Sequence, residues 1–180
     1  MSLLPTTLDY KKILLDEGPV IDVRAPVEFS SGAFPLAANL PLMFDEERKK
    51  VGTCYKQHGR EAAINLGFKL VSGDNKQAKV NHWLEFIKKQ KSTVYITCFR
   101  GGLRSQISQK WISEQNAEVV RFEKGYKHFR QWVVDESKNY FLKNSLKVLT
   151  GPTGSGKTVV LQKIKNYPTL DLEDLESDNF

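Results

Sequence analysis

The chain has 180 residues, of which 40% are hydrophobic and 27% are charged, and its formal net charge is +6. These values are ordinary for a globular protein and suffice for one core and part of a second. No run of about 18 apolar residues is present, so we expect no membrane span. Two cysteines, Cys54 and Cys98, are too few for a disulfide framework or a zinc site, which favours a cytoplasmic protein. The basic charge fits an anionic partner such as nucleic acid without requiring one.

Strands and helices alternate over residues 1–138, which we interpret as one domain. Short apolar runs predict strands at residues 19–23, 38–40, 93–97 and 118–122. Helical spacing of apolar residues predicts helices at residues 7–17, 25–31, 45–57, 60–70, 76–89, 106–112 and 126–136, with a break at His58-Gly59. The alternation predicts an α/β domain with a central, mostly parallel sheet flanked by helices. Ligands of such sheets bind at the carboxyl ends of the strands.

A second domain is predicted after a linker at residues 139–145. A strand at residues 146–150 leads into the segment from Gly151 to Thr158, and a helix at residues 159–165 follows. The segment matches the pattern G-x-x-x-x-G-K-[ST] of a phosphate-binding P-loop, in the strand-to-helix context that this motif requires. We interpret residues 146–180 as the start of a P-loop NTPase-like domain, with one more strand beginning at residues 169–172.

The P-loop match assigns a chemical role to six residues. Glycines leave backbone N–H groups free to surround phosphates, Lys157 is expected to reach the terminal phosphates, and Thr158 is expected to ligate Mg²⁺. The nucleotide-binding residues are Gly151, Gly154, Ser155, Gly156, Lys157 and Thr158. Because few residues follow Thr158, we expect the nucleotide site within this sequence to be incomplete.

A second glycine-rich loop carries a cysteine. Cys98 follows the predicted strand at residues 93–97, and the predicted helix at residues 106–112 comes shortly after it. The backbone N–H groups of such a loop and the dipole of the helix both favour an anion, and both favour thiolate over thiol. We predict that Cys98 is a nucleophile in an anion-binding loop. The loop residues are Phe99, Arg100, Gly101, Gly102, Leu103, Arg104 and Ser105.

Charged and polar residues near this loop receive different roles. Arg104 and Ser105 are expected to bind the anion or the developing thiolate. Asp22 and Arg24 follow another predicted strand, and we expect them to form an ion pair that braces the loop. Glu28 is expected to cap a helix or to pair nearby. For these last three residues a structural role is favoured over a catalytic one.

Several motifs of the first domain resemble the rhodanese family. They are Ile21-Asp22-Val23-Arg24, Glu28-Phe29, Gly32 and Asn39-Leu40-Pro41, followed by the strand, cysteine loop and helix, and then by Gly125 in the closing turn. The resemblance implies a small α/β domain whose cysteine carries a persulfide or its selenium equivalent. Two departures matter. Ala33-Phe34 replaces a common histidine-isoleucine pair, and five residues separate Cys98 from Arg104, one more than in common single-domain members. The longer loop resembles phosphatase and arsenate-reductase relatives, which hold a larger oxyanion.

A longer series of motifs resembles the family of tRNA 2-selenouridine synthases. In the same order along nearly the whole chain stand Val51-Gly52-Thr53-Cys54-Tyr55-Lys56-Gln57, Glu61-Ala62-Ala63, Leu66-Gly67, the Arg100-Gly101-Gly102 loop, Gly125-Tyr126-Lys127, the P-loop and Leu170-Asp171-Leu172-Glu173. By that resemblance Cys98 is the catalytic cysteine. The resemblance implies a tRNA with 2-thiouridine at the wobble position as substrate. It also implies that sulfur is replaced by selenium from selenophosphate, through a geranylated intermediate made from geranyl diphosphate.

The same resemblance implies further partners and missing parts. An enzyme that supplies selenophosphate is expected as a partner, and no tightly bound cofactor is expected. Members of the family continue well past the position of Phe180. We therefore expect the remaining P-loop and tRNA-binding parts to lie outside this sequence.

Three other functions stay open at this stage. They are a generic rhodanese sulfurtransferase, a cysteine-dependent phosphatase or arsenate reductase, and a non-catalytic rhodanese-like module. A phosphatase usually needs a carboxylic acid near the nucleophile to protonate the leaving group, and none is obvious in the loop. The intact Cys98 argues against a non-catalytic module. Selenophosphate is a phosphate-sized anion and suits the longer loop, so selenium transfer to tRNA is the interpretation that we favour.

Overall fold

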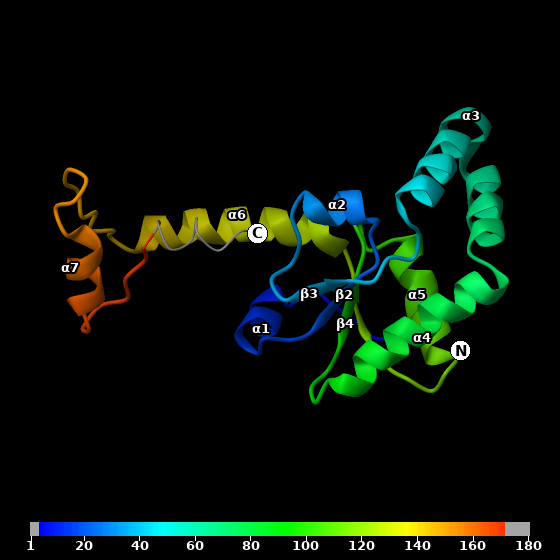
Figure 1. Ribbon diagram of the computed structural model, residues 1–180, viewed down its shortest axis with the longest axis horizontal. Helices are drawn as coiled ribbons and strands as arrows, with labels where there is room; N and C mark the ends of the chain where they lie inside the picture. Colours follow the sequence, from blue (N-terminus) through cyan, green and yellow to red (C-terminus); the bar gives the residue numbers. More distant parts are fainter. Residues whose placement is uncertain (1–3, 172–180) are drawn as a thin grey trace. The chain divides into compact units, whose positions relative to one another are not determined.

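The computed structural model describes residues 4–171 and divides the chain into two compact units, Met1–Val134 and Asp135–Phe180. The first unit contains a sheet with helices around it, and the second contains the end of a long helix, one short helix and loops (Figure 1). The candidate cysteine belongs to the first unit and the P-loop segment to the second. Each unit is therefore described by itself.

A five-stranded sheet forms the centre of the first unit. Its strands are β1 (Thr6–Thr7), β2 (Val20–Asp22), β3 (Ala37–Asn39), β4 (Tyr95–Thr97) and β5 (Val120–Phe122). The strand order is β1-β5-β4-β2-β3, and every neighbouring pair is parallel. The α/β fold with a parallel sheet is thereby confirmed. Because β4 is the middle strand, the residue that follows it lies at the centre of the carboxyl edge of the sheet.

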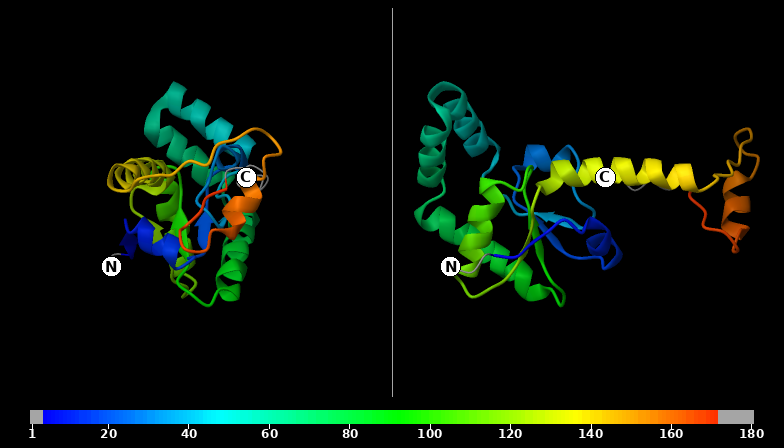
Figure 2. Two further views of the ribbon diagram at one scale, coloured as in Figure 1. Left: turned by 90° about the vertical axis from the view of Figure 1, so that its left-hand side faces the viewer. Right: turned by 180° about the vertical axis from the view of Figure 1, so that it is seen from behind.

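Helices connect the strands and cover both faces of the sheet (Figure 2). The helices of the first unit are α1 (Tyr10–Leu15), α2 (Pro26–Ser30), α3 (Asp45–Leu70), α4 (Gly73–Lys89), α5 (Leu103–Ser113) and α6 (Gly125–Lys143), whose end continues into the second unit. Helix α7 (Lys157–Lys163) belongs to the second unit. Successive residues of a strand point to opposite faces. Accordingly, Ile21 joins a hydrophobic cluster with Trp83 of α4, whereas its neighbour Val20 joins a cluster with Tyr10 of α1 and Phe129 of α6.

Helix α3 is a hairpin of two helical arms. The helix is interrupted at Gly59, whose φ of 80° and ψ of −175° are non-helical. A positive φ is accessible to glycine at little cost, so this residue lets the helix reverse. The break expected at His58-Gly59 is therefore confirmed. Ala63 is the one fully buried residue among those described in α3, and Figure 1 shows the hairpin standing away from the sheet.

Four local features differ from the sequence-based expectations. Strand β1 was not expected, because two residues carry no recognisable pattern and are held only by pairing with β5. Helix α6 continues to Lys143 and includes most of the expected linker, since residues 135–143 contain neither glycine nor proline. The strand expected at residues 146–150 is not formed, because within residues 4–171 no segment pairs with it. Residues 169–171 are also not a strand, and Leu172 lies outside the described residues.

Candidate functional site

Cys98 lies at the carboxyl end of the central strand, buried beneath its own loop. Its side chain is 3% exposed. The Sγ atom lies 3.1 Å from Oγ of Ser105 and 3.9 Å from the carbonyl oxygen of Gly102. Ser105 is in the first turn of α5, so the thiol faces the amino end of that helix. The structure thus brings together the strand, the thiol, the serine and the helix terminus that the sequence placed in one segment.

Helix α6 holds the backbone of the loop through hydrogen bonds to the loop's carbonyl groups. The N–H of Tyr126 donates to the carbonyl of Cys98 at 2.9 Å, and the N–H of Lys127 donates to the carbonyl of Phe99 at 2.9 Å. Both donors are in the first turn of α6. The first amides of a helix have no partner within the helix, so they are available to fix a neighbouring loop. These bonds turn the first two carbonyl groups of the loop toward α6.

Two glycines allow the loop and the start of α6 to meet backbone to backbone. Gly101 has a φ of 66°, and a Cβ atom there would lie 2.1 Å from the carbonyl oxygen of Glu123. Gly125 has a φ of 67°, and a Cβ atom there would lie 2.3 Å from the nitrogen of Gly101. Nη1 of Arg121, in β5, donates to the carbonyl of Gly101 at 2.6 Å. Both positions therefore require glycine, for space as well as for conformation.

The amide groups of the same loop are left without partners. Within the part of the chain that the structure describes, the N–H groups from Arg100 through Arg104 have no hydrogen-bond acceptor in the protein. The loop leads directly into α5, whose dipole adds positive potential at its amino end. Successive unpaired amides at a helix start are a typical binding site for phosphate-like anions. The geometry can therefore hold an oxyanion beside the Cys98 thiol.

Arg104 is paired with a carboxylate rather than standing alone. Its Nη1 and Nη2 atoms contact the two carboxylate oxygens of Glu28, the second at 3.1 Å. Glu28 also accepts from Arg48 Nε at 3.2 Å and from the backbone N–H of Ala25. Glu28 thus both caps α2 and pairs, as expected. Anion binding by Arg104 stays a prediction, and the structure shows a guanidinium already fixed in orientation by a carboxylate.

This pair holds both of its members in the charged form. Burial alone would raise the pKa of Glu28, but the hydrogen bond and charge of Arg104 and the charge of Arg48 lower that pKa below its ordinary value. Burial alone would lower the pKa of Arg104, but Glu28 raises it above its ordinary value. An ionised Glu28 has no proton to donate. It is therefore unsuited to protonate the leaving group of a phosphatase reaction at neutral pH.

Asp22 and Arg24 form a buried ion pair next to the loop. Nη2 of Arg24 lies 2.7 Å from Oδ2 of Asp22, and the two side chains are 1% and 0% exposed. The guanidinium also donates to the carbonyls of Glu28 and Gly32 at 3.0 Å and 2.8 Å, and lies 4.0 Å from the ring centre of Tyr126. Nε of the guanidinium donates to Asp22, and Nη1 and Nη2 fix the turn that carries Glu28. This geometry is that of a structural brace.

A hollow lies beside the cysteine loop, and the sequence did not predict it. Its volume is about 660 Å³, and it is bounded by the two arms of α3 and the start of α5. Leu103 and Arg104 of the cysteine loop form part of its wall, and Glu28 also borders it.

The sequence also did not indicate that Arg121 supports the cysteine loop. Its position as a charged residue in an otherwise apolar strand was the one sequence feature that could have indicated it.

The P-loop segment is exposed and closed on itself. Nζ of Lys157 donates to the carbonyls of Gly151 and Pro152 at 3.2 Å and 3.1 Å. Gly154 and Gly156 have φ values of 79° and 80°, and Gly156 stands directly before α7. The loop is therefore formed around its lysine, although the strand expected before it is absent. Lys157 and Thr158 stand at the start of α7, and their binding of a nucleotide phosphate and Mg²⁺ stays a prediction.

Two surveys of the described residues complete the picture. Within residues 4–171, no group of three or more His, Cys, Asp or Glu side chains is arranged to hold a metal ion. In that same range, no helix is long and apolar enough to span a bilayer.

Several curated proteins with similar sequences carry the same name. The chain is 49% identical over 175 residues to the tRNA 2-selenouridine synthase of Sulfurovum sp. (strain NBC37-1), which covers 97% of this chain and 47% of that protein. The chain is a homologue of the tRNA 2-selenouridine synthases. The synthase of Pseudomonas syringae pv. syringae (strain B728a) is 49% identical over 167 residues, and that of Shewanella pealeana is 48% identical over 167 residues. This synthase homologue spans about half the length of the curated relatives it matches.

A solved structure supports the fold of the synthase homologue. The N-terminal domain of a putative ATP/GTP binding protein from Clostridium difficile 630 superposes with a TM-score of 0.59 and is 31% identical. The match covers 69% of this chain and 95% of that domain. No protein-family model matches the chain.

Proposed function

We propose that the chain is the cysteine-bearing part of a transferase that replaces sulfur by selenium in the wobble 2-thiouridine of tRNA. The observation that carries the proposal is the loop of unpaired amides from Arg100 through Arg104, which connects the buried Cys98 to the start of α5. Such a loop suits the phosphate group of selenophosphate. The similarity to proteins named tRNA 2-selenouridine synthase supports tRNA as the substrate. A reducing cytoplasm, which keeps Cys98 reduced, is the compartment that we propose.

The proposed exchange divides into two chemical tasks. First, the sulfur of 2-thiouridine forms a bond to C1 of geranyl diphosphate while the C1–O bond breaks, diphosphate leaves, and the base loses its N3 proton to solvent. Second, in the net change at C2 of the base, a bond to selenium forms, the C2–S bond breaks and the geranyl thiol leaves. Water then cleaves the Se–P bond and releases phosphate. Alkylation makes the sulfur leave as a thiol rather than as sulfide, which is chemically easier.

Within this scheme the residues of the chain have definite tasks. The loop amides would hold the phosphate of selenophosphate. The Cys98 thiolate would engage the activated base at C2, displacing the geranyl thiol and being displaced in turn by selenium. Glu28 and Arg104 would keep the loop in shape, because their pairing ties α2 to α5. Lys157 and Thr158 would bind a nucleotide phosphate and Mg²⁺ in the second unit. A selenophosphate-supplying enzyme is the proposed upstream partner.

The test uses a chimera in which residues 1–180 replace the matching region of the Sulfurovum relative, expressed in cells that lack their own synthase. We expect selenium in wobble uridine with the parent chimera and background selenium with Cys98→Ser, measured by mass spectrometry of tRNA nucleosides. Cys54→Ser is the matched control, because Cys54 is the other free cysteine and lies in α3, not in the loop. Normal selenium incorporation by Cys98→Ser would refute the proposal.

The phosphatase alternative is tested with the same variants. A cysteine-dependent phosphatase would hydrolyse an aryl phosphate in a reaction that Cys98→Ser abolishes. We expect no such hydrolysis, because Glu28 is the carboxylate paired with the loop arginine and is held ionised. Cyanide-dependent release of thiocyanate from thiosulfate, without selenium incorporation into tRNA, would instead identify a generic sulfurtransferase.

A further inference from the structure

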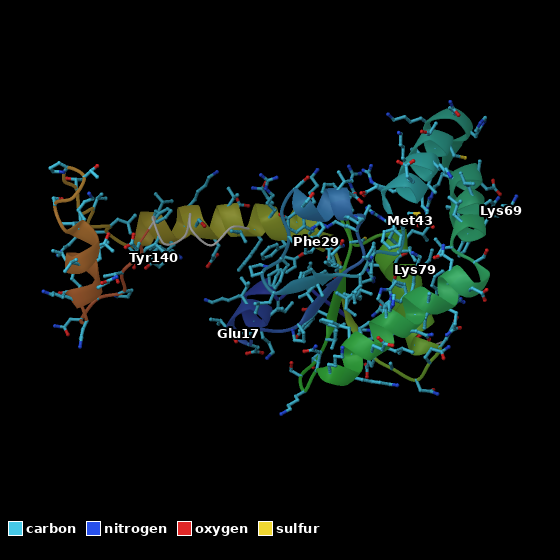
Figure 3. All side chains as sticks on the ribbon, viewed as in Figure 1. Glu17, Phe29, Met43, Lys69, Lys79 and Tyr140 are labelled. Atoms are coloured by element: carbon cyan, nitrogen blue, oxygen red, sulfur yellow. The ribbon has the colours of Figure 1, made fainter. Side chains whose placement is uncertain are left out.

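The hollow beside the cysteine loop has a chemistry that sulfur-for-selenium exchange alone does not require. Its volume of about 660 Å³ lies within the range of roughly 300–1,000 Å³ typical of small-molecule sites. Selenophosphate and a nucleobase are both small and polar. The walls of the hollow are instead mainly aliphatic and aromatic, and include Leu42, Met43, Val51, Ile64, Phe68 and Ile107. Figure 3 labels Met43 at the base of the α3 hairpin.

Cations gather on the exposed side of the same hollow. Lys49, Lys56 and Arg60 line it, all three are exposed, and none forms an ion pair within residues 4–171. Glu28 is the one acidic residue that lines the hollow, and its charge is already matched by Arg104 and Arg48. The unmatched charge at the entrance is therefore positive. Apolar walls with a cationic entrance complement a ligand that has an apolar body and an anionic head.

The walls are unsuited to a nucleobase as the body of that ligand. Thr53 and Tyr55 are the only lining residues with a neutral hydroxyl group. A buried base would leave several of its donors and acceptors without partners, which costs free energy for each group. A hydrocarbon chain has no such groups and gains from leaving water in proportion to its apolar area. The chemistry of the hollow therefore favours a hydrocarbon chain over a base.

We propose that the hollow between the arms of α3 and the start of α5 binds a short isoprenoid chain, with its diphosphate at Lys49, Lys56 and Arg60. This inference rests on the proposed function, which includes a geranyl group but leaves its location open. Leu103 and Arg104 belong both to this hollow and to the cysteine loop. The hollow therefore adjoins the Cys98 loop. Carbon C1 of the chain carries the diphosphate, so the reactive end would lie at the cationic entrance, while the tail extends between the apolar walls of the arms of α3.

The first test measures binding of geranyl diphosphate to the 180-residue chain by isothermal titration calorimetry. Ile64→Glu places a charge on the apolar wall, and we expect it to weaken binding by about tenfold or more. Asn65→Glu introduces the same residue at the neighbouring exposed position, which does not line the hollow, and should bind as the parent does. Geraniol and inorganic diphosphate, which each lack one half of the ligand, should each bind at least about tenfold more weakly.

A second pair of variants tests the cationic entrance. Lys56→Glu should weaken binding of geranyl diphosphate by about tenfold and leave binding of geraniol unchanged. Lys69→Glu lies in the same helix outside the hollow and is the matched control. Equal binding of inorganic diphosphate and geranyl diphosphate would overturn the proposal, because the site would then recognise only an anion. Unchanged binding in both Ile64→Glu and Lys56→Glu would overturn it as well.

The isoprenoid chain could arrive as free diphosphate or already attached to the base. An anticodon stem-loop carrying S-geranyl-2-thiouridine, compared with the same RNA lacking the geranyl group, distinguishes these sources. Geranyl-dependent RNA binding that Ile64→Glu weakens would support the apolar part of the site for the attached chain. The proposed isoprenoid site and the proposed selenium transfer can be refuted independently of each other. Cys98→Ser should abolish selenium incorporation and leave binding of geranyl diphosphate intact, whereas Ile64→Glu should weaken that binding even if the chain transfers no selenium.

Discussion

The cysteine loop and the P-loop are two glycine-rich segments with the same sequence context, and they reach different structural states. The cysteine loop follows the central strand, and its carbonyls are held by α6 and by Arg121 of β5. The P-loop follows no strand, and its lysine bonds to its own loop carbonyls. A glycine-rich motif supplies conformational freedom, whereas a neighbouring framework decides whether that freedom is fixed into a site.

The largest expected effect comes from glycines that are fixed by packing. Gly101→Ala should lower the free energy of unfolding of the first unit by about 4 kcal/mol or more, because its Cβ would meet a backbone carbonyl at 2.1 Å. Gly154→Ala is the matched change in the P-loop, where φ is also positive but no atom lies within 4 Å of the added Cβ. It should leave the first unit unchanged within about 0.5 kcal/mol.

Urea denaturation followed by tryptophan fluorescence measures this difference directly. The chain has three tryptophans, at positions 83, 111 and 132, and all of them lie in the unit Met1–Val134. The fluorescence therefore reports on the unit that contains the cysteine loop. Equal unfolding free energies for the parent and Gly101→Ala would show that the loop is as loosely held as the P-loop.

The next effect concerns the brace beneath the cysteine loop. Asp22→Ala leaves the guanidinium of Arg24 buried without its carboxylate, and should cost about 3–5 kcal/mol of unfolding free energy. The double variant Asp22→Ala with Arg24→Met removes the buried charge and should recover part of that loss. A double variant no more stable than Asp22→Ala would show that the lost ion pair, and not the stranded charge, causes the effect.

The smallest effect is a pH dependence at Glu28. Its pKa in the folded state lies below the reference value of 4.5, so its contribution is complete above that pH and is lost as pH falls through the lowered folded-state pKa. Glu28→Gln should cost about 1–2 kcal/mol at pH 7, and this difference from the parent should shrink on acidification below pH 4.5. Urea midpoints measured between pH 3 and pH 7 test it. A difference that stays constant over that range would contradict an ionic role.

Much of the first unit could be predicted because its sequence patterns are local. Apolar runs marked strands β2 to β5, and glycine at position 59 marked the break in α3. Strand β1 could not be predicted, since two residues become a strand only through pairing with β5. The segment before the P-loop is the opposite case, in which a strand pattern in the sequence forms no strand. Its apolar run is a strand pattern, but an isolated strand leaves its backbone groups without partners.

The candidate site also has features that could be predicted from the sequence and features that could not. Cys98, its glycines and the Asp22–Arg24 pair could be named from sequence, because each belongs to a short motif with a chemical reason for its spacing. The pairing of Glu28 with Arg104 joins residues 76 positions apart, and the sequence only suggested that Glu28 would cap or pair nearby. The hollow is assembled from α2, α3 and α5, so no single segment of the sequence indicates it.

The sequence by itself determined the order of the elements, the identity of the candidate nucleophile and the relation to the selenouridine synthases, because these depend on residue types and short spacings. Only the tertiary structure decided which glycine-rich loop is fixed by hydrogen bonds to its neighbours, and where a hollow with apolar walls adjoins it. The physical reason is that hydrogen bonds and packing between distant segments fix these features. Such contacts have no representation in local sequence patterns.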